Sequence, residues 1–213
     1  MVRHKPEKKS GITLRPVSMV ERLRPSELPG MNETRSLLLS NDPKIRQDGA
    51  WYARGMSVRG EDISPLGSPI ISAMRAELKS GTNPMTLVYL TEAVCSFSRG
   101  GHDIEQFLSV LSPCVTHSNM HVRYNAISAL ADHARRGGEI GLNIESLVSR
   151  LEDMSQAVQE ISLAALRIYA SSGPLAAHQV TLCLGSDDSR LMESARERRS
   201  ELREHCESVL GKK

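Results

Sequence analysis

The strongest constraint on the fold is a pattern that repeats along the chain from about residue 31. Segments 60–64, 101–105 and 141–145 each begin with Gly, carry Asp or Asn at the third position and Ile at the fourth. Asp and Asn cap the free N–H groups of a helix start, and Gly ends the preceding helix. The repeated isoleucines, Ile63, Ile104 and Ile144, are 41 and 40 residues apart. A period of this length is typical of stacked helical units.

Apolar residues follow each of these isoleucines at intervals of three, four and seven residues, as in Ile144, Leu147, Val148 and Leu151. Such a stripe predicts a helix that is buried on one side. We expect these second helices to start within about two residues of the capping position, because capping signals locate helix ends no better than that. The predicted capping residues are Asp62, Asp103 and Asn143.

A second set of helices alternates with the first. Its apolar anchors are Ile45, Leu87, Val122, Val158 and Leu191, and the residue four positions later is small in every case: Gly49, Thr91, Ala126, Ser162 and Ala195. A small residue at this position predicts that neighbouring helices approach closely. Eight residues after the anchor the residues are again of core type, except Arg199 in the last copy.

One pair of helices cannot bury its apolar stripe alone, so consecutive pairs must stack into a continuous core. The pattern therefore predicts an all-α fold, opened by a helix over about 32–40 and closed by a charged helix over about 188–210. The residues expected in the core are Ile63, Ile104, Ile144, Leu111, Leu151, Val122, Leu130 and Leu166.

Two segments, 41–46 and 119–130, resemble the inter-repeat turn and first helix of HEAT/armadillo repeats, with Arg46 and Arg123 after the turn. The second and fourth repeats lack this Arg and carry Val88 and Gln159. The resemblance implies a right-handed α-solenoid of four to five hairpins over residues 31–213. It also implies that the two arginines pair with an acidic or carbonyl group of the adjacent turn, and that the domain acts as a protein-binding scaffold.

Residues 1–30 differ from the rest of the chain. They hold seven Lys and Arg against three Glu, whereas the formal net charge of the whole chain is only +2. With prolines at positions 6, 16, 25 and 29 and no long apolar face, this tail is expected to be disordered. Its charge supports an alternative function, a nucleic-acid-binding accessory protein that uses the tail.

The chain has no apolar run of the roughly 20 residues that a membrane span needs, and its charged start does not resemble a secretory signal. Its four cysteines are widely spaced without a CxxC pair, which is typical of free thiols in a reducing compartment. These features predict a cytoplasmic protein without a membrane partner.

Motifs that would support catalysis are missing: the sequence contains no GxSxG, Walker-type loop, HExxH or dinucleotide fingerprint. We therefore expect no enzymatic activity and no cofactor. Cys114, His117 and His121 have a spacing suitable for zinc, but a turn explains these polar residues without a metal. Trp51 near Asp48 admits a third function, because some HEAT-like proteins excise damaged bases, although a single Trp in a helix is more often a packing residue.

The exposed side of the predicted second helices offers a candidate binding surface, since second helices commonly line the concave side of such solenoids. The columns of this side are small, polar and mildly acidic, so a peptide or protein partner fits better than a phosphate backbone. The candidate binding residues are Glu105, Ser109, Glu145, Ser149, Arg150 and Glu152.

Overall fold

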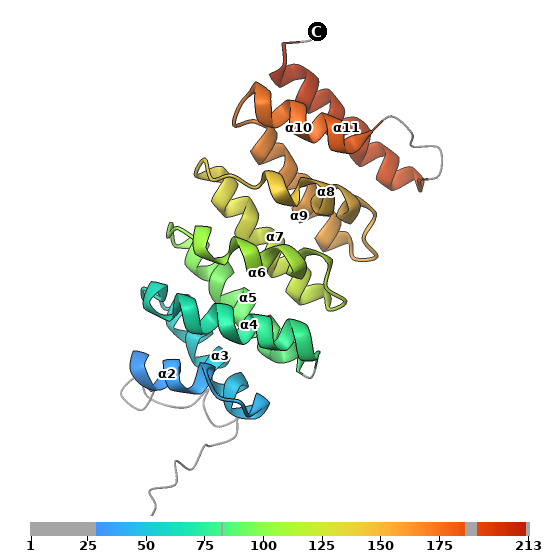
Figure 1. Ribbon diagram of the computed structural model, residues 1–213. Helices are drawn as coiled ribbons and strands as arrows, with labels where there is room; N and C mark the ends of the chain where they lie inside the picture. The colour runs from blue at the N-terminus through green and yellow to red at the C-terminus, as the bar shows by residue number, and fades with distance from the viewer. Residues whose placement is uncertain (1–28, 82, 186–190, 212–213) are drawn as a thin grey trace, which may run out of the picture.

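The computed structural model describes residues 29–81, 83–185 and 191–211, and within these ranges the chain is helical and contains no strand (Figure 1). The α-helices are α2 (Met31–Leu38), α3 (Pro43–Val58), α4 (Gly67–Ser80), α5 (Pro84–Arg99), α6 (Leu108–Leu111), α7 (Met120–Arg135), α8 (Ile144–Ser149), α9 (Gln156–Ala170), α10 (Pro174–Leu184) and α11 (Glu193–Val209). In the described part of the chain they are joined by five 3-10 helices: η2 (Ser64–Leu66), η3 (Glu105–Phe107), η4 (Ser112–Thr116), η5 (Gly141–Asn143) and η6 (Arg150–Glu152). The predicted all-α fold is confirmed.

Two predicted segments fall partly outside these ranges. The basic tail lies outside the described residues except for its last two, Pro29 and Gly30, and the final charged helix begins at Glu193 rather than near residue 188. No helix in the described part of the chain is both long and apolar enough to cross a lipid bilayer.

The helices form two layers (Figure 1). In the long-helix layer, α3, α5, α7 and α9 stack side by side, each packed against the next. The covering layer consists of α4, α6, α8 and α10 with their 3-10 turns, and it packs on one side of this stack. Helix α2 packs on α3 at one end, and α11 packs on α9 and α10 at the other. The core lies between the layers, and it buries all eight residues predicted for it: Ile63, Ile104, Ile144, Leu111, Leu151, Val122, Leu130 and Leu166.

The four long helices share one register. The side chains of Asp42, Asn83 and Asn119 accept a hydrogen bond from the backbone N–H two residues later, at 2.8, 3.1 and 2.9 Å, so each caps its helix. Eighteen residues after each cap, and after Ser155 of α9, the chain turns through a glycine with positive φ, which other residues rarely adopt. These glycines are Gly60, Gly101, Gly137 and Gly173, and they are 41, 36 and 36 residues apart.

The covering layer follows the same spacing, which corrects the predicted register of the third repeat. Ile63, Ile104 and Ile140 each stand immediately before a 3-10 turn, so Ile140 is the true counterpart and Ile144 lies one helical turn later. Asp62 and Asp103 do cap their turns, each accepting a backbone N–H at 2.9 Å. In the third repeat the acceptor is Glu139, which binds the N–H of Gly141 at 2.5 Å. Asn143, predicted to be a cap, is buried and makes no capping hydrogen bond with its side chain.

The first hairpin, α3 with α4, is closed by a buried ion pair. Arg46 Nε donates to Glu77 Oε1 at 2.9 Å, and Nη1 donates to the carbonyl of Ser40 in the turn before α3 at 2.8 Å. The two side chains are 9% and 1% exposed. The predicted pairing of Arg46 with acidic and carbonyl groups is confirmed, and its acid comes from near the end of α4.

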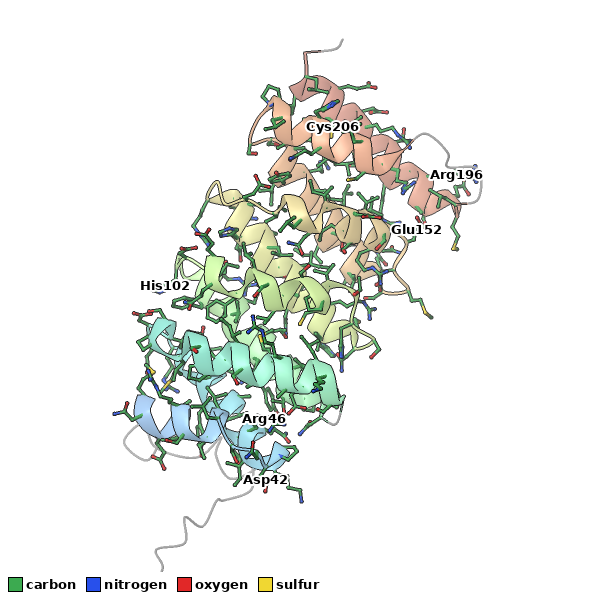
Figure 2. All side chains as sticks on the ribbon, in the orientation of Figure 1. Asp42, Arg46, His102, Glu152, Arg196 and Cys206 are labelled. Atoms are coloured by element: carbon green, nitrogen blue, oxygen red, sulfur yellow. The ribbon has the colours of Figure 1, made fainter. Side chains whose placement is uncertain are left out.

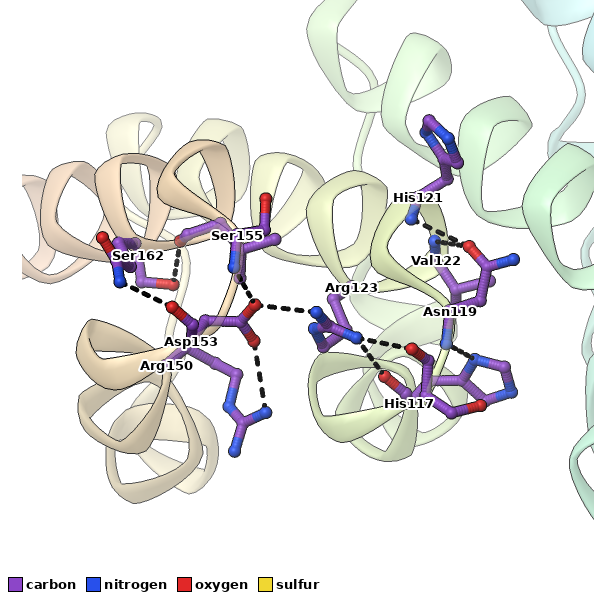
Figure 3. A network of polar contacts seen from close by, with 12 residues as sticks. His117, Asn119, His121, Val122, Arg123, Arg150, Asp153, Ser155 and Ser162 are labelled. Atoms are coloured by element: carbon purple, nitrogen blue, oxygen red, sulfur yellow. Dashed lines mark hydrogen bonds and ion pairs between the residues drawn. The ribbon is translucent and has the colours of Figure 1, made fainter.

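Arg123 makes the corresponding contacts two repeats later (Figure 3). Its Nη1 donates to the carbonyls of His117 and Ser118 at 2.8 Å, and its Nη2 lies 2.7 Å from Asp153 Oδ1. Burial alone would raise the pKa of Asp153. The hydrogen bonds from Arg123 and from the Ser155 N–H, together with the charges of Arg123 and Arg150, outweigh burial and lower this pKa below its usual value.

The other two long helices carry different residues at this position. In α9, Gln159 Nε2 donates to the carbonyl of Asp153 at 2.5 Å, so a neutral side chain makes the same contact to the preceding turn. In α5 the residue at the position of Arg46 and Arg123 is Leu87, which is buried. The predicted alignment, which put Val88 at this position, is therefore off by one residue.

We expect Ala126→Leu to lower the free energy of unfolding by about 1–3 kcal/mol, because a larger side chain overpacks a close helix junction. Ala126 is fully buried in α7, which packs between α5 and α9. The control is Ser149→Leu at an exposed position, where the change should stay within about 0.5 kcal/mol. Urea denaturation measures the free energy of unfolding of both variants. Equal losses of this free energy would show that Ala126 does not lie at a close junction between helices.

We expect Asp153→Asn to lower the free energy of unfolding by about 3–5 kcal/mol near neutral pH, because it leaves the buried Arg123 without its countercharge. The neighbouring exposed Glu152→Gln is the matched control and should change it by less than about 0.5 kcal/mol. Chemical denaturation measures both.

The same pair of proteins tests the direction of the Asp153 pKa shift. A carboxylate whose pKa is lowered by folding stabilises the fold fully above its unfolded pKa of about 3.9, and this stabilisation is lost as the pH falls towards the folded pKa. The difference between wild type and Asp153→Asn should therefore narrow below about pH 4. A difference that grows on acidification would mean that the folded pKa is raised.

Candidate binding surfaces of the helical stack

The six residues predicted to bind a partner all lie on the covering layer. Glu105 belongs to η3, Ser109 to α6, Glu145 and Ser149 to α8, and Arg150 and Glu152 to η6. Glu152 is labelled in Figure 2. Five of them are exposed; the sixth, Arg150, is partly buried and lies 3.3 Å from Asp153 through its Nη1. Arg150 is thus engaged in the ion-pair network that holds the fold.

The corrected register changes how these residues align. Glu145 occupies the position of Ser68 and Ser109, whereas the counterpart of Glu105 in the third repeat is Gly141. The predicted acidic column of Glu105 and Glu145 is therefore not a column in the folded protein. Binding by the exposed members of this set stays a prediction.

A different surface emerges on the opposite side of the long-helix layer, which we call the outer face. Helices α5 and α7 have a long helix on either side and the covering layer on a third side, so their exposed side chains point to this face. The chain has seven aromatic residues. Tyr89 and Tyr124 are on this face, with Tyr124 38% exposed, and Trp51 of α3 is also partly exposed. Phe97, Phe107 and Tyr169 are instead buried.

Between its protruding residues, α7 presents short side chains. Tyr124, Ser128, Ala131 and Arg135 recur at helical spacing on one side of α7, yet Ser128 and Ala131 are only 4% and 2% exposed. Their low exposure follows from short side chains set between closely packed neighbours. The middle of α7 is therefore covered by its neighbours on this face, whereas Tyr124 and Arg135 are exposed.

Ion pairs cross the outer face from helix to helix. Arg54 Nε of α3 lies 2.7 Å from Glu92 of α5, and Arg167 of α9 lies 2.5 Å from Glu201 of α11. Between them, Asp132 of α7 is paired both with Arg99 of α5 and with Arg135 of its own helix. Basic and acidic groups are thus interleaved on this face.

The outer face is not predicted as a surface from the sequence, in which Trp51 stands out only as a single residue. The signal is the alignment of the long helices on their capping residues. It places Trp51, Glu92, Ser128 and Ala164 at one position, nine residues after the cap.

The residues considered for zinc do not form a ligand set. Cys114 is buried, its Sγ lies 3.2 Å from the carbonyl of Val110, and burial raises the pKa of its thiol to about 12, which disfavours the thiolate that zinc requires. His117 Nδ1 accepts the N–H of Asn119, and the side chain of His121 is exposed (Figure 3). No group of three metal-binding side chains gathers anywhere in the described ranges.

Trp51 and Asp48, the residues considered for base excision, lie in α3. The ring of Trp51 meets that of Tyr52 edge to face with centroids 5.3 Å apart, and Asp48 is partly buried. Burial, and then the charge of Asp42, raise the pKa of Asp48. Cavities of about 500, 280 and 200 Å³ lie at the glycine turns that follow α7 and α9 and around the turn before α10, and neither Trp51 nor Asp48 lines them.

No protein-family model and no curated protein sequence matches this chain. Solved structures do. A designed armadillo repeat protein in complex with the peptide (KR)4 is 15% identical with a TM-score of 0.60, over 89% of this chain and 84% of that one. An armadillo repeat protein designed for modular peptide recognition is 15% identical with a TM-score of 0.58, over 82% and 81%. At such identities the likeness concerns the fold, and the chain therefore has the armadillo-type fold of stacked helical hairpins.

Proposed function

We propose that this protein is a non-enzymatic scaffold that binds an extended segment of another protein along the outer face. The observation that carries the proposal is the distribution of the aromatic residues. A chain with only one Trp and four Tyr leaves Trp51, Tyr89 and Tyr124 accessible on one face. Trp and Tyr contribute large contact areas and a polar handle, and they dominate the binding energy of protein interfaces.

The packing of the layers supports the same face. Each long helix packs directly on the next from α3 to α9, whereas α4, α6 and α8 contact one another much less. In a curved stack the more closely packed layer lies on the inner side. The inner side of a solenoid provides an extended concave surface, which is the surface such proteins use for binding. The packing therefore supports binding on the long helices rather than on the covering layer.

The structural likeness supports a peptide-like ligand without identifying it. One similar structure is a designed armadillo repeat protein that binds (KR)4. That ligand is strongly basic, whereas the arginines of our outer face alternate with acids. We therefore propose the mode of binding, an extended segment across stacked helices, and not the same ligand chemistry.

A nucleic acid fits the outer face less well. Phosphate contacts supply most nucleic-acid affinity and require basic groups that are free to neutralise them. On the outer face, Arg54 is paired with Glu92 of α5, and Arg167 is paired with Glu201 of α11. The remaining route to nucleic acid, the basic tail, lies outside the described residues.

We expect Tyr124→Ala and Trp51→Ala each to weaken peptide binding by about 10-fold or more, equivalent to about 1.4 kcal/mol, because each removes an exposed aromatic contact. The probe is a random library of 12-residue peptides displayed on phage and selected on the wild-type protein. Affinities of the selected peptides are then measured by fluorescence anisotropy.

The control is Glu105→Lys with Glu145→Lys, which reverses two exposed charges on the covering layer. It should leave the selected peptides' affinity unchanged. If this double variant abolishes binding while Tyr124→Ala does not, the partner lies on the covering layer and our choice of face is wrong. Binding of single-stranded RNA that disappears when residues 1–28 are deleted, and falls steeply with salt, would favour the nucleic-acid function instead.

A further inference from the structure

The C-terminal ends of α5 and α7 bring two arginines to one carboxylate. Arg99 and Arg135 occupy the same position in their helices, 16 residues after the capping residue. Asp132 lies between them: its Oδ2 is 3.9 Å from Arg99 Nε, and its Oδ1 accepts a hydrogen bond from Arg135 Nη1. Two side chains from neighbouring helices are thus held at one point of the outer face.

Exposure separates this cluster from the other ion pairs. The side chains of Arg99 and Arg135 are 66% and 60% exposed, whereas Asp132 is only 13% exposed. In the Arg54–Glu92 pair both side chains are about one-third exposed, with one acid for each base. The cluster at α5 and α7 therefore carries one excess positive charge and turns it towards solvent.

The guanidinium groups keep donors available for a further ligand. A guanidinium has five N–H donors in a planar fork that matches a carboxylate. Within the described ranges, the side chain of Arg135 makes its hydrogen bond and ion pair to Asp132 alone. The side chain of Arg99 pairs with Asp132 and donates to Cys95 Sγ at 3.7 Å. Asp132 accepts a hydrogen bond from Arg135 and lies beside Arg99, so most donors of both arginines stay free.

A cavity of about 500 Å³ adjoins this cluster. Arg135 lines it together with the apolar Ala134 and Ile168, and with Gly137, Ser171 and Ser172. It lies where α7 and α9 end, so it is close to the charge cluster on the same side of the layer. Its apolar part can accept a small aliphatic side chain beside a charged neighbour.

We propose that Arg99 and Arg135, held by Asp132, bind an Asp or Glu side chain of the partner segment, and that the adjoining cavity receives an apolar residue next to it. The inference rests on the proposed function and adds the chemistry of the partner. A carboxylate balances the single excess charge, and charge-assisted hydrogen bonds to arginine are about twice as strong as neutral ones.

The same charge count favours an acidic protein segment over a phosphate backbone. A nucleic acid strand presents a charge at every nucleotide, so its site should show basic residues in register on successive helices. At the position of Arg99 and Arg135, α3 carries Val58 and α9 carries Ser171. The basic position is therefore confined to two helices, as one acidic side chain requires.

The test uses the phage-displayed 12-residue peptide library selected on the full-length wild-type protein. Selected peptides should share an Asp or Glu and an apolar residue at a fixed separation from it. The double variant Arg99→Gln with Arg135→Gln should bind them at least about 10-fold more weakly. Replacing the acidic residue of the peptide by its amide should lower the affinity of the wild-type protein by the same factor. The same replacement should not lower the affinity of the double variant any further.

Two controls separate recognition from folding. Arg75→Gln removes an exposed arginine from the covering layer and should leave affinity unchanged. Thermal unfolding of the double variant should match wild type closely, because the replaced side chains are mostly exposed. Arg135→Glu should reverse the selection and enrich Lys or Arg at the position of the acid.

The outcomes distinguish this inference from the proposed function. Peptides that depend on Tyr124, lack a shared acid and tolerate the double variant would overturn the inference and leave the proposed function standing. A library that yields no peptide at all would overturn both. If the double variant loses binding to a 20-nucleotide single-stranded RNA while wild type selects no acidic peptide, the cluster binds phosphate and the inference is wrong.

Discussion

The stack depends on buried arginine–carboxylate pairs at the starts of α3 and α7. Each arginine donates to the turn before its own helix and to an acid that follows in the covering layer, Glu77 in α4 or Asp153 in the loop after η6. Each pair therefore fixes a long helix against the segment that leads to the next long helix. Asp153 extends the chain of contacts, because its Oδ1 also accepts the N–H of Ser155 at the start of α9. A buried ion pair adds little net stability, whereas an arginine without its acid is costly. The pairs therefore act mainly by fixing how hairpins stack.

These contacts explain why the repeats tolerate unequal lengths. The first hairpin is five residues longer than the next two, and its extra length lies in α4, which has 14 residues against four in α6 and six in α8. Glu77 reaches Arg46 from within a regular helix, whereas Asp153 reaches Arg123 from the loop after η6. The geometry of the long helices is conserved between hairpins, and the covering layer absorbs the difference. Long-helix surfaces therefore match from hairpin to hairpin, whereas the covering layer shares a register only where each hairpin turns and differs in the length of its helices.

The sequence predicts the fold because helical periodicity reports burial directly. Its errors are errors of alignment, by one residue at Leu87 and by one turn of helix at Ile140. Ile140 and Ile144 both fit an apolar stripe, and the 3-10 turn after Ile140, capped by the Glu139 side chain, identifies Ile140 as the counterpart of Ile104. The outer face could not be predicted in the same way. Exposure of Tyr124 and burial of Ala131 depend on how closely α5 and α9 flank α7, which local sequence does not specify.

The spacing of the helices limits how a partner can use this face. Neighbouring packed helices lie about 8–10 Å apart, and an extended chain advances about 3.3 Å per residue. A segment that crosses the layer therefore meets a new long helix about every three residues. Trp51, Tyr89 and Tyr124 stand on three neighbouring long helices, so an extended segment would pass from one to the next about every three residues. Side chains of an extended strand alternate between its faces, so successive contacts from the face turned towards the protein would use residues two or four apart. Only part of such a segment can therefore be read, and the sequence between contacts is free to vary.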